Sequence, residues 1–268
     1  MTVRICVAGA TGWVGRDLCK AIAAADDLSL VGAVARKAAG RALGPEIGLA
    51  DPLGVRLSAG VAEALKAPTD VLVDYTHPGA VKGHALAAIE RGVAVVIGTS
   101  GLGAADFDEI DRAARAKGVG VIAAGNFSLT AALLKRFALE AARHVSHWEI
   151  LDYASATKPD VPSGTARELA ERLAEIRRPA EDVPIEAVHG PKEARGAHLG
   201  GSRVHSIRLP SYVLACEIVF GAADERLVLR HEAGAGATPY VAGTLLAARK
   251  VVALKGLVRG LDRLLFED

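Results

Sequence analysis

Residues 5–15 of the chain read Ile-Cys-Val-Ala-Gly-Ala-Thr-Gly-Trp-Val-Gly. The first four form an unbroken apolar run, which is typical of a strand that a sheet buries on both faces. Apolar residues then recur at helical spacing up to position 25, so Gly9, Gly12 and Gly15 stand where a strand turns into a helix. Glycines there let the backbone turn tightly and approach a pyrophosphate, which the helix N-terminus stabilises. The pattern indicates a nucleotide-binding loop; the alternative is an ordinary turn between a strand and a helix.

The alternation of short apolar runs and helical patterns continues through the first half of the chain. Strands are predicted at residues 28–34, 71–74, 93–97 and 119–123, with helices at 80–91 and 107–117. Strands that lack polar alternation and are separated by helices favour a parallel sheet covered on both faces. The sequence therefore predicts an α/β fold with a Rossmann-like doubly wound parallel sheet, and ligands beyond the carboxyl ends of its strands.

The pattern changes after about residue 128. A helix at 131–144, a strand at 148–153 and a helix after Ser163 precede strands at 204–209, 213–220 and 227–231. The short links between these last strands favour antiparallel hairpins, and the glycine-rich stretch 190–202 is predicted to be a mobile loop. A final helix is expected at 239–254. We therefore expect a dinucleotide-binding domain of residues 1–127 and 241–268 and a second, α+β domain of residues 128–240.

Composition and charge argue against several classes of function. The 268 residues carry 32 Lys and Arg against 31 Asp and Glu, a formal charge of +1, whereas nucleic-acid binding needs a clustered excess of cations. No apolar run reaches the roughly 18 residues of a membrane span. Three cysteines without a C-x-x-C pair, and the lack of an H-E-x-x-H run, predict no metal site. The first residues lack a signal-peptide pattern, so we expect a cytoplasmic protein with no nucleic-acid or membrane partner.

The end of the second predicted strand bears on the choice of nucleotide. Residues 34–37 read Val-Ala-Arg-Lys. An acidic residue here would hold the ribose 2′-hydroxyl of NAD, which Ala35 cannot do, whereas Arg36 and Lys37 offer donors for a 2′-phosphate. We therefore expect NADPH as the cofactor, with NADH possible. The alternative is a solvated basic pair on a surface loop.

Residues 158–166 read Lys-Pro-Asp-Val-Pro-Ser-Gly-Thr-Ala, which resembles the signature of the dihydrodipicolinate reductase family. Further stretches are similar to that family's other landmarks, in its order: Asp-Tyr-Thr-His-Pro at 74–78, Gly-Thr-Ser-Gly at 98–101, Asn-Phe-Ser at 126–128 and Arg-Val-His-Ser-Ile-Arg-Leu-Pro at 203–210. Together these matches are specific, and the resemblance covers most of the chain.

The resemblance implies NAD(P)H-dependent reduction of a small dicarboxylate or imino acid in lysine and diaminopimelate biosynthesis. It also implies that the second domain binds the substrate and builds a homotetramer through its sheet. The positions that it assigns to the cofactor are Gly9, Ala10, Thr11, Gly12, Trp13, Val14, Ala35, Arg36, Gly98, Thr99, Ser100, Ala124, Gly125, Asn126 and Phe127. The positions that it assigns to the substrate are Lys158, Gly164 and Thr165, and we add Ser155 and Ser163 from the same segment.

One segment departs from the family pattern. The family has a His-His-x-His-Lys run, whereas residues 154–158 here read Ala-Ser-Ala-Thr-Lys. By the resemblance, Ala154 takes the place of the histidine that acts as acid or base, and Ser155 that of a histidine that contacts the substrate. Ala154 cannot exchange a proton, and Ser155 offers only a neutral hydrogen bond. Lys158 is then the best remaining proton donor and the predicted catalytic residue; the alternative is a solvated loop lysine.

Ser163, Gly164 and Thr165 precede a strong helix-forming run. Backbone N–H groups at the start of that helix can hold a substrate carboxylate, with Thr165 adding a hydroxyl, although an ordinary serine N-cap would look the same. Three hypotheses of function stay open. The chain is a reductase with the family's reaction, a related imine or amino-acid oxidoreductase with another substrate, or a catalytically silent NADPH-binding protein.

Overall fold

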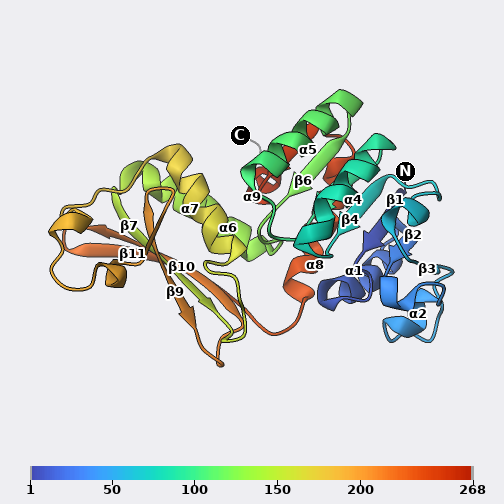
Figure 1. Cartoon of the computed structure of the whole chain (residues 1–268), viewed down its shortest axis with the longest axis horizontal. Helices are drawn as coiled ribbons and strands as arrows, with labels where there is room; N and C mark the ends of the chain where they lie inside the picture. The colour runs from blue at the N-terminus through green and yellow to red at the C-terminus, as the bar shows by residue number, and fades with distance from the viewer. Residues whose placement is uncertain (1, 267–268) are drawn as a thin grey trace. The chain divides into compact units, whose positions relative to one another are not determined.

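The chain divides into two units, which the computed structural model describes over residues 2–266 (Figure 1). The first unit contains the residues up to Leu129 and the segment from Ala237 onward. The second unit is Thr130–Gly236. The chain therefore leaves the first unit once and returns to it to complete the same sheet.

The first unit is built on a parallel sheet with the strand order β12-β6-β5-β4-β1-β2-β3. The strands are β1 (Val3–Ala8), β2 (Leu28–Val34), β3 (Leu57–Ser58), β4 (Val71–Asp74), β5 (Ala94–Ile97), β6 (Gly120–Ala123) and β12 (Gly256–Arg259). The chain runs outward from β1 through β2 and β3 and then crosses to β4, so the strand order reverses beside β1. Ligands of doubly wound sheets bind at such a reversal, beyond the carboxyl ends of the strands. The predicted Rossmann-like doubly wound fold is confirmed.

Helices cover both faces of this sheet. On one face α1 (Trp13–Ala23) packs beside α8 (Thr238–Val251), and on the other lie α3 (Val61–Ala64), α4 (Pro78–Glu90) and α5 (Ala104–Lys117). Shorter helical segments are η1 (Arg36–Ala38), α2 (Leu43–Glu46) and α9 (Asp262–Leu265). Within residues 2–266, no helix combines the length and the apolar character that crossing a bilayer requires.

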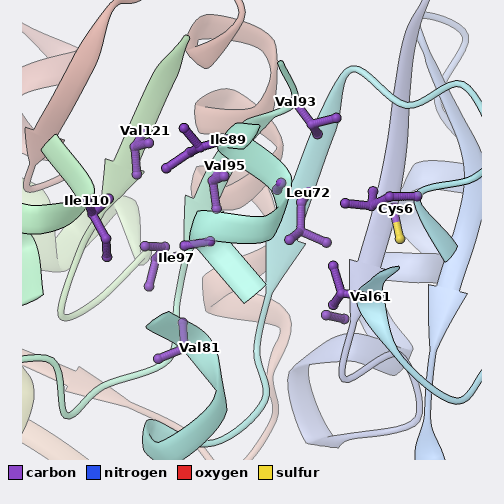
Figure 2. Packing of buried hydrophobic residues seen from close by; sticks show 14 of the residues in the cluster. Cys6, Val61, Leu72, Val81, Ile89, Val93, Val95, Ile97, Ile110 and Val121 are labelled. Atoms are coloured by element: carbon purple, nitrogen blue, oxygen red, sulfur yellow. The ribbon is translucent and has the colours of Figure 1, made fainter. Parts of the chain in front are cut away.

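Apolar side chains fill the layer between the sheet and α3, α4 and α5 (Figure 2). Cys6, Leu72, Val95 and Val121 come from four neighbouring strands, and each is fully buried. Val73 points to the opposite face of its strand and is buried as well. Because both faces are covered, these strands read as unbroken apolar runs, and the sequence could reveal them.

Two strands of this sheet, β3 and β12, were not predicted. Both lie at edges, where a strand pairs on one side only. β3 is two residues long, and β12 begins at Gly256, whose φ of +81° is left-handed, and ends at Arg259. Neither strand has the long apolar run by which the central strands are recognised.

The second unit packs two helices against one face of a mixed sheet with the order β11-β10-β7-β9-β8. The strands are β7 (His147–Ala154), β8 (Ala197–Leu199), β9 (Ser202–Arg208), β10 (Leu214–Ala222) and β11 (Glu225–Ala233). The helices are α6 (Leu129–His144) and α7 (Gly164–Ile176), and two helical turns, η2 (Ile185–Ala187) and η3 (Lys192–Arg195), follow α7. Trp148, Ile150 and Phe220 are buried between the sheet and the helices. The predicted α+β architecture of this part of the chain is confirmed.

Two details predicted for this unit are wrong. Residues 204–209 and 213–220 do not form a hairpin, because β7 lies between them, parallel to β9 and antiparallel to β10. β7 carries a row of buried side chains, and a central place in the sheet covers such a strand better than an edge does. The stretch 190–202 is not simply a loop, since it holds η3 and β8, which pairs with β9. β8 is only three residues long and lies among glycines and charged residues, so the sequence pattern does not predict it.

The core of the first unit can be tested with two matched substitutions. Val121→Ala should lower the free energy of unfolding by about 2 kcal/mol, because it removes two buried methyl groups and leaves a cavity. Val252→Ala, at a residue that is 47% exposed, should change it by less than about 0.5 kcal/mol. Denaturant unfolding followed by circular dichroism measures both. Equal losses would contradict the core described here.

Candidate active site

The glycine loop lies at the carboxyl end of β1 and turns directly into α1. Gly9 has a left-handed φ of +84°, and a Cβ there would meet the carbonyl oxygen of Tyr75 at 2.2 Å. A Cβ on Gly15 would lie 2.0 Å from the Gly9 carbonyl oxygen, so glycine lets α1 approach the loop closely. Gly12 is the N-cap of α1 and has no side chain to cap it, and the described first turn holds no acidic residue. The start of α1 therefore presents backbone N–H groups and a positive dipole end to an anion.

The remaining predicted residues of this loop serve different purposes. Ala10 and Val14 are buried and pack. The carbonyl oxygen of Thr11 accepts a hydrogen bond from Arg16 Nε at 2.8 Å. Trp13 is 55% exposed, and its indole lies edge-on to Tyr240 with the ring centres 5.6 Å apart. The indole of Trp13 therefore lies at the surface of the glycine loop.

A buried carboxylate organises the neighbouring strand ends. Asp74, the last residue of β4, is fully buried, and its Oδ1 accepts hydrogen bonds from the Thr76 backbone at 3.0 Å and the Thr76 hydroxyl at 2.7 Å. The Thr99 hydroxyl donates to the same oxygen at 2.8 Å, and His84 Nδ1 lies 2.8 Å from Oδ2. The Gly98 N–H donates to the Asp74 carbonyl at 3.0 Å. The segments that follow β4 and β5 are thus both held by hydrogen bonds to Asp74.

Tyr75 fills the space beside this carboxylate. A Cβ on Gly98 would overlap the Tyr75 ring at 2.1 Å, so glycine is required there. The Tyr75 hydroxyl lies 2.8 Å from the Thr244 hydroxyl, and burial raises the pKa of Tyr75 well above its ordinary value. The Phe127 ring lies edge-on to Tyr75 and is 1% exposed. Phe127, predicted at a cofactor position, therefore has its ring in the core and can offer a ligand only its backbone.

The other predicted residues after β5 and β6 lie at the same edge of the sheet. Ser100 and Gly125 are exposed, and Ala124 is half-buried. Asn126 is almost buried, and its Oδ1 accepts a hydrogen bond from the Ser128 N–H at 2.8 Å. Because β1, β4, β5 and β6 are neighbours, the structure brings these residues to one edge together with the glycine loop.

Arg36 and Lys37 form η1 directly after β2, the other neighbour of β1. Both are exposed, and neither forms an ion pair with any residue that the structure describes. Ala35 precedes them, and its N–H donates to the Ser58 carbonyl at 3.1 Å. The end of β2 is therefore followed by two exposed cationic side chains that are not ion-paired within residues 2–266.

Lys158 lies in the turn between β7 and α7 in the second unit. Its Nζ is 2.6 Å from Asp160 Oδ1, and both side chains are about one-third exposed. The Lys158 N–H donates to the Ser155 carbonyl at 3.0 Å, and Ser155 Oγ lies 3.1 Å from the Thr157 hydroxyl. Ser155 therefore shapes the turn that presents the ammonium group, while the ammonium itself stays accessible to solvent.

Ser163 is buried and caps α7, because its Oγ accepts a hydrogen bond from the Ala166 N–H at 3.4 Å. Gly164 and Thr165 are the first two residues of the helix and are half-buried. The described first turn of α7 has no acidic residue, so the positive end of the helix dipole is retained. A serine cap and an anion site are compatible here, since the cap satisfies one N–H group and leaves the dipole in place.

A second buried carboxylate lies beneath this segment. Asp152, in β7, is fully buried, and its Oδ2 accepts hydrogen bonds from Arg208 Nη2 at 2.7 Å, the Ser163 N–H at 2.9 Å and the Ser206 hydroxyl at 3.2 Å. Arg208 Nη2 also donates to the Asp160 carbonyl at 2.9 Å. This one oxygen joins β7, β9 and the start of α7.

Ala154 is the last residue of β7 and is fully buried. Its carbonyl accepts a hydrogen bond from the Leu209 N–H at 3.1 Å. Position 154 therefore holds a methyl group in the core, which cannot exchange a proton.

Sequence reasoning gave no role to Asp74, His84, Asp152 or Arg208. A signal for both aspartates was present, since residues 71–74 read Val-Leu-Val-Asp and residues 150–152 read Ile-Leu-Asp. A carboxylate at the end of a buried apolar run has to be surrounded by donors. Nothing in the sequence identifies His84 or Arg208 as those donors.

Other groups in the chain do not add to the site. Burial raises the pKa of the Cys6, Cys19 and Cys216 thiols to about 12 each, so they stay protonated. In residues 2–266, no cluster of three or more His, Cys, Asp or Glu side chains is placed to hold a metal ion. A cavity of about 880 Å³ lies in the second unit between the start of β7, the end of β10 and residues 179–195, and none of the predicted site residues lines it.

Comparison with known proteins matches both units. A family model described as the N-terminal part of dihydrodipicolinate reductase matches residues 3–127, and one described as its C-terminal part matches residues 130–265. The chain is 40% identical over 267 residues to a 4-hydroxy-tetrahydrodipicolinate reductase of Moorella thermoacetica and 37% identical over 265 residues to one of Desulfitobacterium hafniense. Each match covers 98% of this chain and 98% of the relative.

Solved structures agree with these matches. The dipicolinate-bound dihydrodipicolinate reductase from Paenisporosarcina sp. TG-14 superposes with a TM-score of 0.80 at 27% identity and covers 98% of this chain and 99% of that one. An amine dehydrogenase from Mycobacterium smegmatis shares the fold, with a TM-score of 0.68 at 17% identity over 98% of this chain and 96% of that one. Since both halves of the family's pattern and relatives of equal length match almost every residue, this chain belongs to the dihydrodipicolinate reductase family.

Proposed function

We propose that this chain is an NAD(P)H-dependent reductase of 4-hydroxy-tetrahydrodipicolinate in the diaminopimelate and lysine pathway. The observation that carries the proposal is the 40% identity, over 98% of both chains, to a reductase of that name. The local geometry supports it. The first unit has a glycine loop at the reversal point of a doubly wound sheet, where an anion can bind, and the second has a lysine in the turn that precedes a helix N-terminus.

The first unit fits a nicotinamide dinucleotide. Gly9 and Gly15 allow the tight turn and the close approach of α1 to the loop, so the N-terminus of α1 would hold the pyrophosphate. Thr76 and Thr99, which Asp74 holds in place, line the edge along which the nicotinamide end would lie. The Thr99 hydroxyl is bonded to Asp74, so its contribution is to set the shape of this edge.

Arg36 and Lys37 favour NADPH over NADH. A 2′-phosphate at the end of β2 would meet the exposed guanidinium group of Arg36 and the exposed ammonium group of Lys37. Neither group forms a competing ion pair among residues 2–266. Ala35 offers no carboxylate to an unphosphorylated ribose. The preferred coenzyme is therefore the phosphorylated one.

Lys158 supplies the proton. When bound, a reduced nicotinamide coenzyme supplies a hydride. Reduction of a conjugated imine places that hydride at one end of the conjugated system and needs a proton at the other. The Lys158 ammonium gives up this proton and becomes a neutral amine, which water then reprotonates. Asp160, 2.6 Å away and partly exposed, holds the ammonium group in place.

The start of α7 holds a carboxylate of the substrate. Gly164 leaves the helix N-terminus open, and Thr165 adds a hydroxyl beside it. A dicarboxylate fits this arrangement better than a neutral imine, because both the helix dipole and Lys158 attract negative charge.

A second candidate is a reductase of another cyclic imino acid. The observation that favours it is that Ala154 is a buried methyl group where the resemblance expects a histidine. General acid–base catalysis by a side chain contributes about 10²–10⁴-fold, so the family's own substrate should turn over slowly if Lys158 acts alone. A panel of cyclic imino acids, compared with freshly generated 4-hydroxy-tetrahydrodipicolinate, distinguishes the two candidates by kcat/KM. NADPH binding without turnover of any of them would contradict both.

Arg36→Ala tests the coenzyme assignment. We expect the Kd for NADPH to rise about ten- to a hundredfold, since one charge-assisted hydrogen bond to phosphate is lost, while the Kd for NADH stays within about twofold. Energy transfer from tryptophan to the reduced coenzyme measures both, because Trp13 stands beside the loop. Arg91→Ala, which removes an exposed cation at the end of α4, is the control and should change neither Kd. An equal loss of NADPH and NADH affinity in Arg36→Ala would refute a 2′-phosphate contact.

Two substitutions of Lys158 separate proton delivery from charge. Lys158→Ala should lower kcat by about 10²–10⁴-fold, measured as NADPH oxidation with freshly generated 4-hydroxy-tetrahydrodipicolinate. Lys158→Arg keeps the positive charge but cannot give up a proton, so it should retain the KM and lose kcat to a similar extent. Unchanged kcat in Lys158→Ala would remove this lysine from the mechanism.

A further inference from the structure

Arg208, the last residue of β9, contacts the lysine-bearing turn and the strand beneath it at once. Its Nη2 donates to Asp152 Oδ2 at 2.7 Å and to the Asp160 carbonyl at 2.9 Å. Its Nη1 donates to the Asp152 carbonyl at 3.2 Å and to the Ile207 carbonyl at 3.0 Å. One guanidinium group therefore links β7 and β9 to the backbone of the residue that pairs with Lys158.

Asp152 extends this link to α7. The carboxylate oxygen that Arg208 contacts also accepts the Ser163 N–H at 2.9 Å, and Ser163 is the N-cap of α7. The two ends of the segment 158–165 are thus tied to the same ion pair, one through Asp160 and the other through Ser163. Because these ends carry Lys158 on one side and Gly164 and Thr165 on the other, the pair fixes the distance between them.

The geometry of the pair favours a positioning role over simple stabilisation. An arginine and a carboxylate bind each other most strongly through two parallel hydrogen bonds. The two Nη groups of Arg208 instead donate to four different oxygens. Among residues 2–266, neither Arg208 Nε nor Asp152 Oδ1 has a hydrogen-bond partner. The side chains are 15% and 0% exposed, so this arrangement is little screened by solvent.

We propose that Arg208, held by Asp152, is a positioning residue that presets the segment 158–165 to receive a dicarboxylate. This inference rests on the proposed function for the identity of the ligand. Arg208 does not touch the substrate or supply a proton. It sets the separation between the Lys158 ammonium and the carboxylate-binding start of α7, and a displacement of about 1 Å in such groups can cost about 10²-fold in rate.

The chain offers a matched control on the same strand. Arg203 also lies in β9, is buried to a similar degree and pairs with Glu181 at 2.6 Å, but the side chains of the Arg203–Glu181 pair form no hydrogen bond or ion pair with residues 158–165. Arg208→Met and Arg203→Met therefore each remove one arginine ion pair of β9, and only the Arg208 pair holds the segment. The two arginines are similarly buried, whereas Glu181 is 32% exposed and Asp152 is fully buried. Arg208→Lys keeps the charge but cannot reproduce the planar fork, and it serves as the test if Arg208→Met fails to fold.

The experiment has three parts. Calorimetry measures the Kd of dipicolinate and of NADPH, steady-state kinetics measure KM and kcat, and hydrogen exchange is followed at the Ser163 and Lys158 N–H groups. For both Arg208 variants we expect the dipicolinate Kd and the KM to rise about tenfold or more, with the NADPH Kd within about twofold and faster exchange at both N–H groups. Arg203→Met should leave the ligand affinities and the exchange of these two groups unchanged.

The proposal would be overturned if Arg208→Lys bound dipicolinate as tightly as the unmodified chain. It would also be overturned if Arg203→Met lost as much dipicolinate affinity as the Arg208 variants. If the unmodified chain neither binds dipicolinate nor turns over, the proposed function fails instead. Hydrogen exchange then still decides the role of Arg208. Faster exchange confined to the Arg208 variants supports positioning of the segment, and unchanged exchange rejects it.

Discussion

A carboxylate buried in or at the end of an apolar strand must be surrounded by hydrogen-bond donors, and this constraint shapes both units of the chain. Asp74 gathers Thr76, Thr99 and His84 at the carboxyl edge of the first sheet. Asp152 gathers Ser163 and Arg208 in the second unit. Strands are more rigid than loops, so each aspartate fixes a neighbouring loop or helix start to the position of a strand.

These supports do not involve the side chains of residues 154 and 155. Ala154 and Ser155 offer a methyl group and a neutral hydroxyl, and Asp152 accepts hydrogen bonds from the N-cap of α7 and from Arg208. Lys158 pairs with Asp160, and the glycine loop makes contacts that only glycine allows. The supports of the segment 158–165 therefore do not depend on a histidine at position 154 or 155.

The sequence was sufficient for the parts of the fold that bury both faces of an element. Apolar runs such as residues 71–74 predicted the central strands, and the glycines at 9, 12 and 15 predicted the turn into α1. The sequence did not predict β3, β12 or β8. All three are edge strands, and an edge strand does not need an apolar run. The order of the second sheet also escaped, since local links suggest hairpins and cannot show that β7 inserts between β9 and β10. For the site, motifs located the candidate residues. Apart from Thr76, which is two positions from Asp74, the side-chain partners of Asp74 and Asp152 lie 10–56 positions away, and no local pattern identifies them.

The central claim is that hydride passes from a nicotinamide coenzyme to a cyclic imine held by this chain. Deuterium transfer tests it most directly. The protein is incubated with freshly generated 4-hydroxy-tetrahydrodipicolinate and with NADPH deuterated on one or the other face of the nicotinamide C4, and the product is examined by mass spectrometry. The account predicts one deuterium in the product from one of the two coenzymes and none from the other. A product without deuterium from either coenzyme would contradict it.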